Sequence, residues 1–194
     1  SAVAWTDIIL VVVLILGGLV TTYLALDTVS GGQGFMEGLT TIYNAVPEKF
    51  DMILDRSNPE FMNLPGIGVL IGGMWVANLY YWGFNQYIIQ RTLAAKSLEE
   101  SQKGILFAAG LKMIMPIIVV IPGIAAYVIV NDPTLLASLG EAGVNNIPSS
   151  GSADKAYPWL MQFLPTGLKG IAIAALAAAI VSSLASMLNS TATI

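Results

Sequence analysis

The sequence contains neither cysteine nor histidine. Without cysteine there is no disulfide framework and no thiolate nucleophile. Without histidine the chain lacks the commonest zinc ligand and the usual base of a catalytic triad. Charged residues are also scarce, at 10% of 194 residues, whereas a soluble domain has about 25%. The net charge of -4 offers no basic surface to a nucleic acid. Together these absences exclude a soluble enzyme, a nucleic-acid-binding protein and a disordered tail.

Apolar residues make up 56% of the chain and are concentrated in four long runs. A helix needs about 20 apolar residues to cross the hydrocarbon layer of a membrane, which is about 30 Å thick. The runs cover residues 8–26, 66–89, 104–130 and 166–189. The sequence therefore predicts an all-α, polytopic membrane helix bundle.

Loop charge predicts the orientation of this bundle. The short connection 90–103 carries three basic residues, whereas the connection 27–65 is dominated by acids and the connection 131–165 holds a single lysine. Because cytoplasmic loops carry an excess of lysine and arginine, we expect 90–103 in the cytoplasm and the two longer connections outside.

The connecting segments carry local signals as well. Ser97 followed by Glu100 is typical of a capping box that begins the third helix. Trp159 suits the outer membrane interface of the fourth. Because the chain begins without methionine and ends directly after the fourth run, we expect it to be part of a larger bundle. Four apolar residues at helical spacing predict a short interfacial helix in the first outer loop: Phe35, Leu39, Tyr43 and Val46.

Polar side chains inside a membrane are costly, so their positions are informative. Asn78, Tyr81, Trp82 and Asn85 are spaced i, i+3, i+4 and i+7, which predicts that they share one helix face. An amide and two amphipathic rings on one face can bind a polyol. The alternative is that these residues join neighbouring helices.

Lys112 lies deep in the third run, four residues before Pro116. Proline has no N–H, so Pro116 removes the helical partner of the Lys112 carbonyl, and Pro122 does the same to Ile118. A kinked helix with an ammonium group lining a wet cavity explains both features. A structural ion pair with a carboxylate elsewhere is the alternative.

The fourth run places neutral oxygen atoms close together. In a helix, the hydroxyl of Ser183 lies near the carbonyl of Ala179, and Ser182 adds a further oxygen. Such a cluster suits a weakly held monovalent cation, although serines in apolar helices often bond only to their own backbone. Asp7 at the start of the first run is either an interfacial anchor or a station for a cation that leaves inward.

Four strings, in order and spacing, resemble the sodium/solute symporter family, and most closely its bacterial sodium/galactose branch. The resemblance covers the whole chain. The strings are AVAWTD at 2–7, NQYIIQRTLAAK at 85–96, LK at 111–112 with the two following prolines, and PTGLKG at 165–170 with SSLAS at 182–186. Asn85 departs from the pattern, since an aspartate is expected there in many animal sugar transporters of the family.

The resemblance implies a core of five-plus-five helices in two inverted repeats, with discontinuous helices and a binding site at the membrane midplane. Residues 1–30 would form the last helix of the first repeat. Residues 31–65 would form an extracellular loop with a short interfacial helix. Residues 66–194 would supply the first three helices of the second repeat.

For the sugar, the resemblance implies that Tyr81 stacks beneath it as an inner gate. Asn78 would hold the Tyr81 hydroxyl and reach the sugar, and Trp82 would flank the gate. Lys112 would donate hydrogen bonds to sugar hydroxyls.

For sodium, the resemblance implies a half-site on the fourth run. The Ala179 carbonyl and the hydroxyls of Ser182 and Ser183 would be ligands. Asp7 would attract sodium on its inward exit.

The resulting hypothesis is sodium-coupled symport of galactose or glucose across a bacterial inner membrane. The chain would be no enzyme and would need no cofactor beyond the coupling ion. Its partners would be sodium, the sugar, the lipid bilayer and the remaining helices of the transporter. Alternatives are symport of an amino or organic acid, an intramembrane enzyme with a serine–lysine dyad, and a channel or scaffold subunit.

Overall fold

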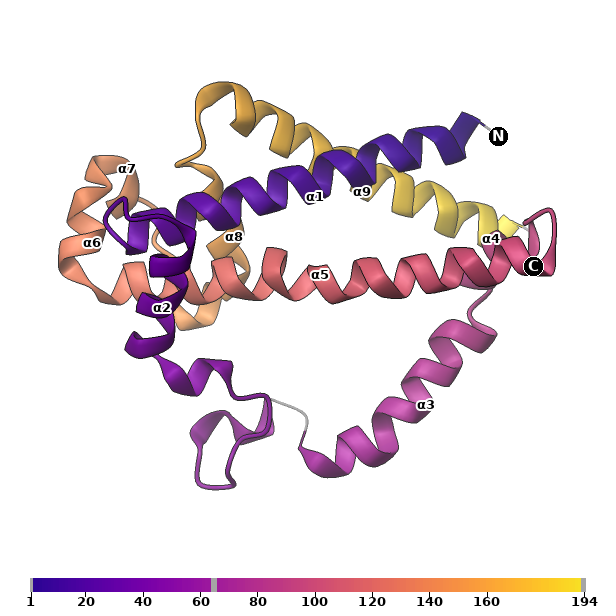
Figure 1. The fold of residues 1–194 in the computed structure, drawn as a ribbon, viewed down its shortest axis with the longest axis horizontal. Coiled ribbons are helices and arrows are strands. Elements are labelled where there is room, and N and C mark those ends of the chain that lie inside the picture. Colours follow the sequence, from indigo (N-terminus) through magenta and orange to yellow (C-terminus); the bar gives the residue numbers. More distant parts are fainter. Residues whose placement is uncertain (1, 64–65, 193–194) are drawn as a thin grey trace. The chain divides into compact units, whose positions relative to one another are not determined.

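The computed structural model describes residues 2–63 and 66–192, which form helices joined by loops and turns (Figure 1). Side chains 2–7, 142 and 150 lie outside this description. The all-α prediction is confirmed for the described part of the chain. The α-helices are α1 Ala2–Val29, α2 Phe35–Ala45, α3 Met74–Leu79, α4 Gln86–Leu93, α5 Leu98–Asn131, α6 Pro133–Ser138, α7 Gly140–Val144, α8 Ala156–Met161 and α9 Thr166–Ala192. The 3-10 helices are η1 Pro47–Phe50, η2 Pro59–Met62 and η5 Ser150–Lys155, and the π-helices are η3 Val69–Gly73 and η4 Tyr80–Phe84.

Three helices in this part of the chain are long and apolar enough to cross a membrane. They are Ile8–Val29 within α1, α5 and α9. They correspond to the first, third and fourth predicted runs. α5 continues through both of its prolines as one helix of 34 residues.

The second predicted run is not one continuous helix. It begins with η3, continues as α3 and η4, and then ends at Asn85, after which α4 begins. Asn85 has an extended backbone (φ -79°, ψ 110°), and its Oδ1 accepts a hydrogen bond from the Tyr87 N–H at 3.1 Å. Asparagine is among the best N-cap residues, so it favours a new helix start here. The expectation of a single helix through residue 89 was therefore wrong, and a helical break lies inside the apolar run.

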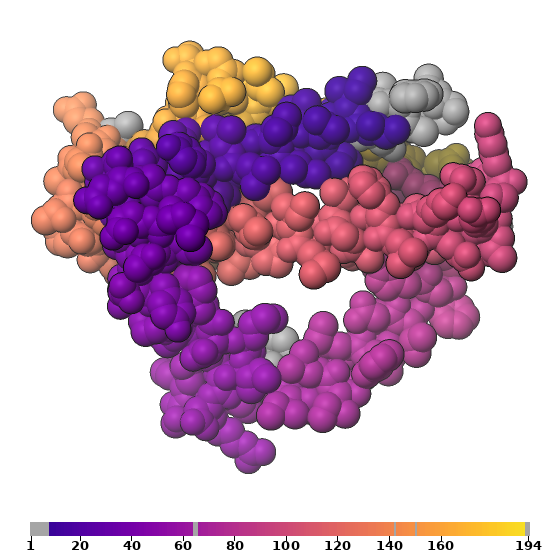
Figure 2. All heavy atoms as spheres, viewed as in Figure 1, coloured from indigo at the N-terminus to yellow at the C-terminus, as the bar shows by residue number. Residues whose placement is uncertain are grey.

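The chain divides into two compact units. The first unit comprises the chain up to Pro47 together with Lys112–Ser182. In it α1 lies against the second half of α5, as the contacting spheres in Figure 2 show. The Thr22 hydroxyl lies 2.9 Å from the Gly18 carbonyl and 3.1 Å from the Ile117 carbonyl, and Thr22 is fully buried. A Cβ at Gly18 would meet the Ile118 side chain at 2.1 Å, so glycine allows this close packing.

The short helix predicted in this connection is confirmed as α2, with Val46 as its C-cap residue. Its Gly38 is buried against the end of α1, where an added Cβ would lie 2.2 Å from the Leu26 carbonyl oxygen. Ile42, one turn later, is fully buried. The connection that follows α1 is therefore packed onto that helix at its start.

The first unit also encloses Trp159, which is 1% exposed. Its Nε1 donates to the Gly143 carbonyl at 3.3 Å, and its ring meets Phe163 edge to face at 5.1 Å between centroids. The indole thus finds both its apolar and its polar partners inside the unit, while its position at the outer membrane interface stays a prediction.

A carboxylate caps the start of α6, directly after α5 ends. The Asp132 side chain accepts hydrogen bonds from the Thr134 hydroxyl at 2.6 Å and from the backbone N–H groups of Thr134 and Leu135. These hydrogen bonds hold the pKa of Asp132 below its ordinary value, and the bond from the Thr134 hydroxyl has the largest effect. Asp132 therefore caps α6 in its charged form.

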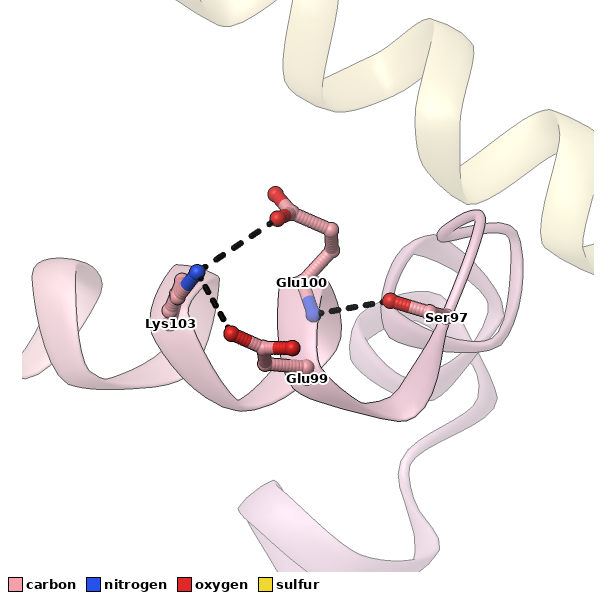
Figure 3. Close-up of polar contacts among 4 residues, drawn as sticks. All are labelled: Ser97, Glu99, Glu100 and Lys103. Atoms are coloured by element: carbon pink, nitrogen blue, oxygen red, sulfur yellow. Dashed lines mark hydrogen bonds and ion pairs between the residues drawn. The ribbon is translucent and has the colours of Figure 1, made fainter.

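The second unit comprises Glu48–Leu111 and the chain from Ser183 onward. α5 begins there as Figure 3 shows: the Glu100 N–H donates to the Ser97 hydroxyl at 3.3 Å. Lys103 forms ion pairs with Glu99 at 2.8 Å and with Glu100 at 3.7 Å. Ser97 is thus the cap that the sequence predicted, while the Glu100 carboxylate faces Lys103 one turn further along.

Candidate functional site

The residues predicted to bind sugar lie where the second apolar run changes helical type. Asn78 is exposed near the end of α3, and its Nδ2 donates to the Met74 carbonyl at 2.8 Å. This bond anchors the amide to its own helix. Because the amide oxygen is a separate acceptor, Asn78 keeps a group that can bind a ligand hydroxyl.

Tyr81 and Trp82 lie on η4. Their rings meet edge to face, with centroids 5.3 Å apart and planes at 84°. Tyr81 is 37% exposed, and Trp82 is half-buried. π-Helical turns are rare overall, but those that occur are frequently found at functional sites. Their wider turn changes the direction in which the side chains point. The local backbone therefore presents two perpendicular aromatic faces beside an amide.

Asn85 does not belong to this group. The prediction of one shared face assumed an α-helical period from Asn78 to Asn85, but η4 widens the turn and Asn85 itself is extended. Its side chain is used to cap α4. The face therefore contains Asn78, Tyr81 and Trp82 within the second unit.

Lys112 lies on α5 at the start of the first unit's portion of that helix, one turn before Pro116. It is exposed in this chain. Its neighbours Met113 and Met115 are exposed apolar residues. The side chain thus carries an ammonium group on an otherwise apolar helix surface.

The predicted sodium ligands lie on α9, which is an unbroken helix. Ala179, Ser182 and Ser183 are all half-buried and lie within slightly more than one turn. Across the described chain, no group of three or more acidic, cysteine or histidine side chains could hold a metal. Asp7 belongs to α1, but its side chain lies outside the described residues.

One polar contact in this region was not predicted from the sequence. The Arg91 guanidinium donates a hydrogen bond to the hydroxyl of Ser186, linking α4 to α9. The Arg91 Cζ also lies 5.7 Å from the centroid of the Tyr87 ring. Ser186 is 8% exposed. Both residues occur in strings that carry the family resemblance, and Arg91 also belongs to the basic connection 90–103, but neither pattern predicts that the two side chains meet.

These features define a class of protein. Three long apolar helices, a further helix broken inside an apolar run, and polar groups gathered beside that break are typical of helical membrane transporters with discontinuous helices.

Comparison with known proteins identifies the family. The Sodium:solute symporter family matches residues 1–194, and the chain belongs to that family. The resemblance predicted from the four strings is thereby confirmed. The protein is a multi-pass membrane protein whose relatives are transporters.

The chain is similar to several curated proteins. It is 68% identical over 194 residues to a sodium/glucose cotransporter of Vibrio parahaemolyticus, covering 100% of this chain and 36% of that protein. It is 36% identical to an uncharacterized symporter of Escherichia coli, and 34% identical to the human sodium/myo-inositol cotransporter 2. In both, the match covers 100% of this chain and 30% of the relative. The chain thus spans about a third of the length of these relatives.

Proposed function

We propose that this chain is part of a transporter that couples the inward movement of sodium to uptake of a hexose, galactose or glucose. The observation that carries this proposal is the 68% identity to a sodium/glucose cotransporter along the whole chain. The aromatic and amide group on α3 and η4, and the oxygen cluster on α9, supply the chemistry that each substrate needs.

In the proposed sugar site, the Tyr81 ring covers the apolar C–H face of the hexose, and Trp82 braces Tyr81 from the side. Support comes from the edge-to-face contact of the two rings and from the partial exposure of Tyr81. Asn78 and Lys112 bind sugar hydroxyls through an amide and an ammonium group.

In the proposed sodium site, the Ala179 carbonyl and the hydroxyls of Ser182 and Ser183 supply part of the coordination shell. Sodium carries a single charge, so neutral oxygens can hold it weakly enough to release it into the cell. Asp7 at the start of α1 attracts the ion on its way out. The absence of formal charge on the α9 ligands supports a reversible monovalent site over a tight divalent one.

The proposed arrangement in the membrane follows from loop charge. Residues 1–30 end one inverted repeat, and residues 66–194 begin the next, with the extracytoplasmic segment 31–65 between them. The connection 90–103 faces the cytoplasm of a bacterial inner membrane, and 131–165 faces outward. The remaining helices of the transporter and the lipid bilayer cover the apolar side chains that this chain leaves exposed.

Symport of an amino or organic acid in the same family is a second candidate, because the Lys112 ammonium can bind a carboxylate as well as a hydroxyl. We do not propose an enzyme, since the relatives are transporters and a serine–lysine nucleophile has no support beyond residue type. No cofactor other than the coupling ion is proposed. A channel or scaffold role would not require the sodium ligands on α9.

The function is tested by reconstituting the full-length transporter into liposomes and measuring uptake of labelled galactose under an inward sodium gradient. We expect saturable accumulation that collapses when the gradient is abolished. Unlabelled glucose should compete, whereas amino and organic acids should not. Uptake that is unchanged when potassium replaces sodium would refute the proposal, and competition by a carboxylate alone would favour the second candidate.

A further inference from the structure

The contact between Arg91 and Ser186 joins two segments that are far apart in the sequence but belong to the same compact unit. Arg91 lies in the last turn of α4, and Ser186 is nearly buried on α9. The guanidinium also approaches the Tyr87 ring, which stabilises a cation through its π face. Arg91 is therefore held by contacts to both helices.

On α9, Ser186 is close to the proposed sodium ligands. It follows Ser183 by three residues and Ser182 by four, so it lies on the same side of the helix about one turn away. One turn corresponds to about 5.4 Å along the axis. The Arg91 cation is thus bonded to the turn next to the proposed sodium site.

On the other side, Arg91 is connected to the proposed sugar site. α4 begins directly after Asn85, and Asn85 ends η4, which carries Tyr81 and Trp82. The orientation of α4 relative to η4 is set at this single extended residue. α4 is therefore linked to the sugar residues at one end and to α9 at the other.

We infer that Arg91 is a positioning residue that couples sodium occupancy of α9 to sugar affinity, an inference that rests on the proposed function. A sodium ion and a guanidinium on adjacent turns repel each other, so bound sodium weakens the Arg91–Ser186 contact. Once α4 is released from α9, it reorients at Asn85, and η4 takes the arrangement that binds sugar more tightly. The coupling is reciprocal: bound sugar favours the released state and so raises sodium affinity by the same factor.

This mechanism predicts in which direction the galactose affinity changes when the contact is lost, which a merely structural contact does not. Removing the contact imitates bound sodium, so Arg91→Ala and Ser186→Ala should raise galactose affinity in the absence of sodium. The affinity in sodium should change little. The galactose affinity in sodium divided by the affinity without sodium should therefore fall from its wild-type value to about one, or at most about two. The double variant should show no further change.

The experiment measures equilibrium binding of labelled galactose to the full-length purified transporter, in sodium chloride and in choline chloride at equal ionic strength. Matched controls lose a hydroxyl on each helix without affecting the contact. Thr92→Ala on α4 removes a bond to the Ile89 carbonyl, and Thr191→Ala on α9 removes a bond to the Met187 carbonyl. Both controls should keep the wild-type ratio. Arg91→Lys keeps the positive charge and a donor, so it should keep part of the sodium effect.

The inference is overturned if Arg91→Ala or Ser186→Ala keeps the wild-type ratio, or if either lowers galactose affinity equally in both salts. A loss of the sodium effect in Arg91→Lys as complete as in Arg91→Ala would also count against it. If galactose binding to the wild-type protein does not respond to sodium, the proposed function itself fails, whatever the variants do.

Discussion

At the scale of single residues, chemistry depends on a few polar side chains set into apolar surroundings. Asn78 and Lys112 could be predicted as candidates because a polar group in an apolar run is conspicuous in the sequence. The Arg91–Ser186 contact could not, because the two residues are separated by 95 positions and only the fold brings them together. Asn85 was predicted on the wrong face, since a π-turn has no strong sequence signal.

Replacing Lys112 by alanine should abolish galactose uptake. The ammonium group is the only proposed charged donor to the sugar, and bonds to charged groups contribute about 1.5–3 kcal/mol each, equivalent to a loss of about 10- to 160-fold in affinity. Initial rates of tracer uptake in liposomes provide the measurement.

The matched control for Lys112 is Lys103→Ala on the same helix, where the side chain is 62% exposed and forms ion pairs with Glu99 and Glu100. Surface pairs of this kind contribute little, so uptake should remain near wild type. Normal galactose accumulation by Lys112→Ala would remove Lys112 from the site.

Replacing Ser183 by alanine should raise the sodium concentration needed for half-maximal uptake by at least tenfold, because one ligand oxygen is lost while α9 keeps its helical backbone. The measurement is galactose uptake as a function of external sodium at constant ionic strength. Thr191→Ala serves as the control. The Thr191 hydroxyl is exposed, lies nearer the C-terminal end of α9 and bonds to a carbonyl of the same helix. An unchanged sodium curve for Ser183→Ala would contradict the assignment.

At the scale of elements, hydrophobic length predicted α1, α5 and α9 well, because a run of more than 20 apolar residues has few other stable forms in a membrane. Helical spacing likewise predicted α2. The break at Asn85 was missed because apolar residues continue on both sides of it, so length alone favours one helix. The burial of Trp159 was not predicted, because an amphipathic ring suits many surroundings and only the fold brings the Gly143 carbonyl to the indole.

Close approach of α2 to α1 depends on Gly38. Gly38→Ala should lower the thermal stability of the transporter, because the new Cβ would lie 2.2 Å from a backbone oxygen of α1 and one helix must move. Overpacking of this kind costs about 1–3 kcal/mol. The midpoint of thermal unfolding in detergent is the quantity to measure.

Thr40→Ala on the exposed side of α2 is the matched control and should shift the unfolding midpoint far less. Equal midpoints for Gly38→Ala and the wild type would show that the two helices can separate at no cost.

At the scale of the whole molecule, the sequence predicted the class of protein from what it lacks: charge, cysteine and histidine. The family was predicted from the order and spacing of four strings, which composition alone does not reveal. The division into two compact units was not predicted, since two of its three boundaries fall inside α5 and α9, where the sequence continues uniformly as helix.

The proposed orientation is testable by single cysteines introduced into a cysteine-free transporter. A cysteine at Gln102 should react with a membrane-impermeant maleimide only when the cytoplasmic face is accessible. A cysteine at Thr40 on α2 should react from the outside of intact cells. The reverse labelling pattern would invert the topology.

The single-residue break at Asn85 has a mechanical consequence. α4 contains eight residues and is therefore about 12 Å long. A swing of about 30° around the Asn85 backbone would carry the far end of α4 through about 6 Å, more than one helical turn. Two torsion angles of one asparagine thus act as the pivot of a lever arm, which can convert a small rotation beside the aromatic pair into a large displacement at the C-terminal end of α4.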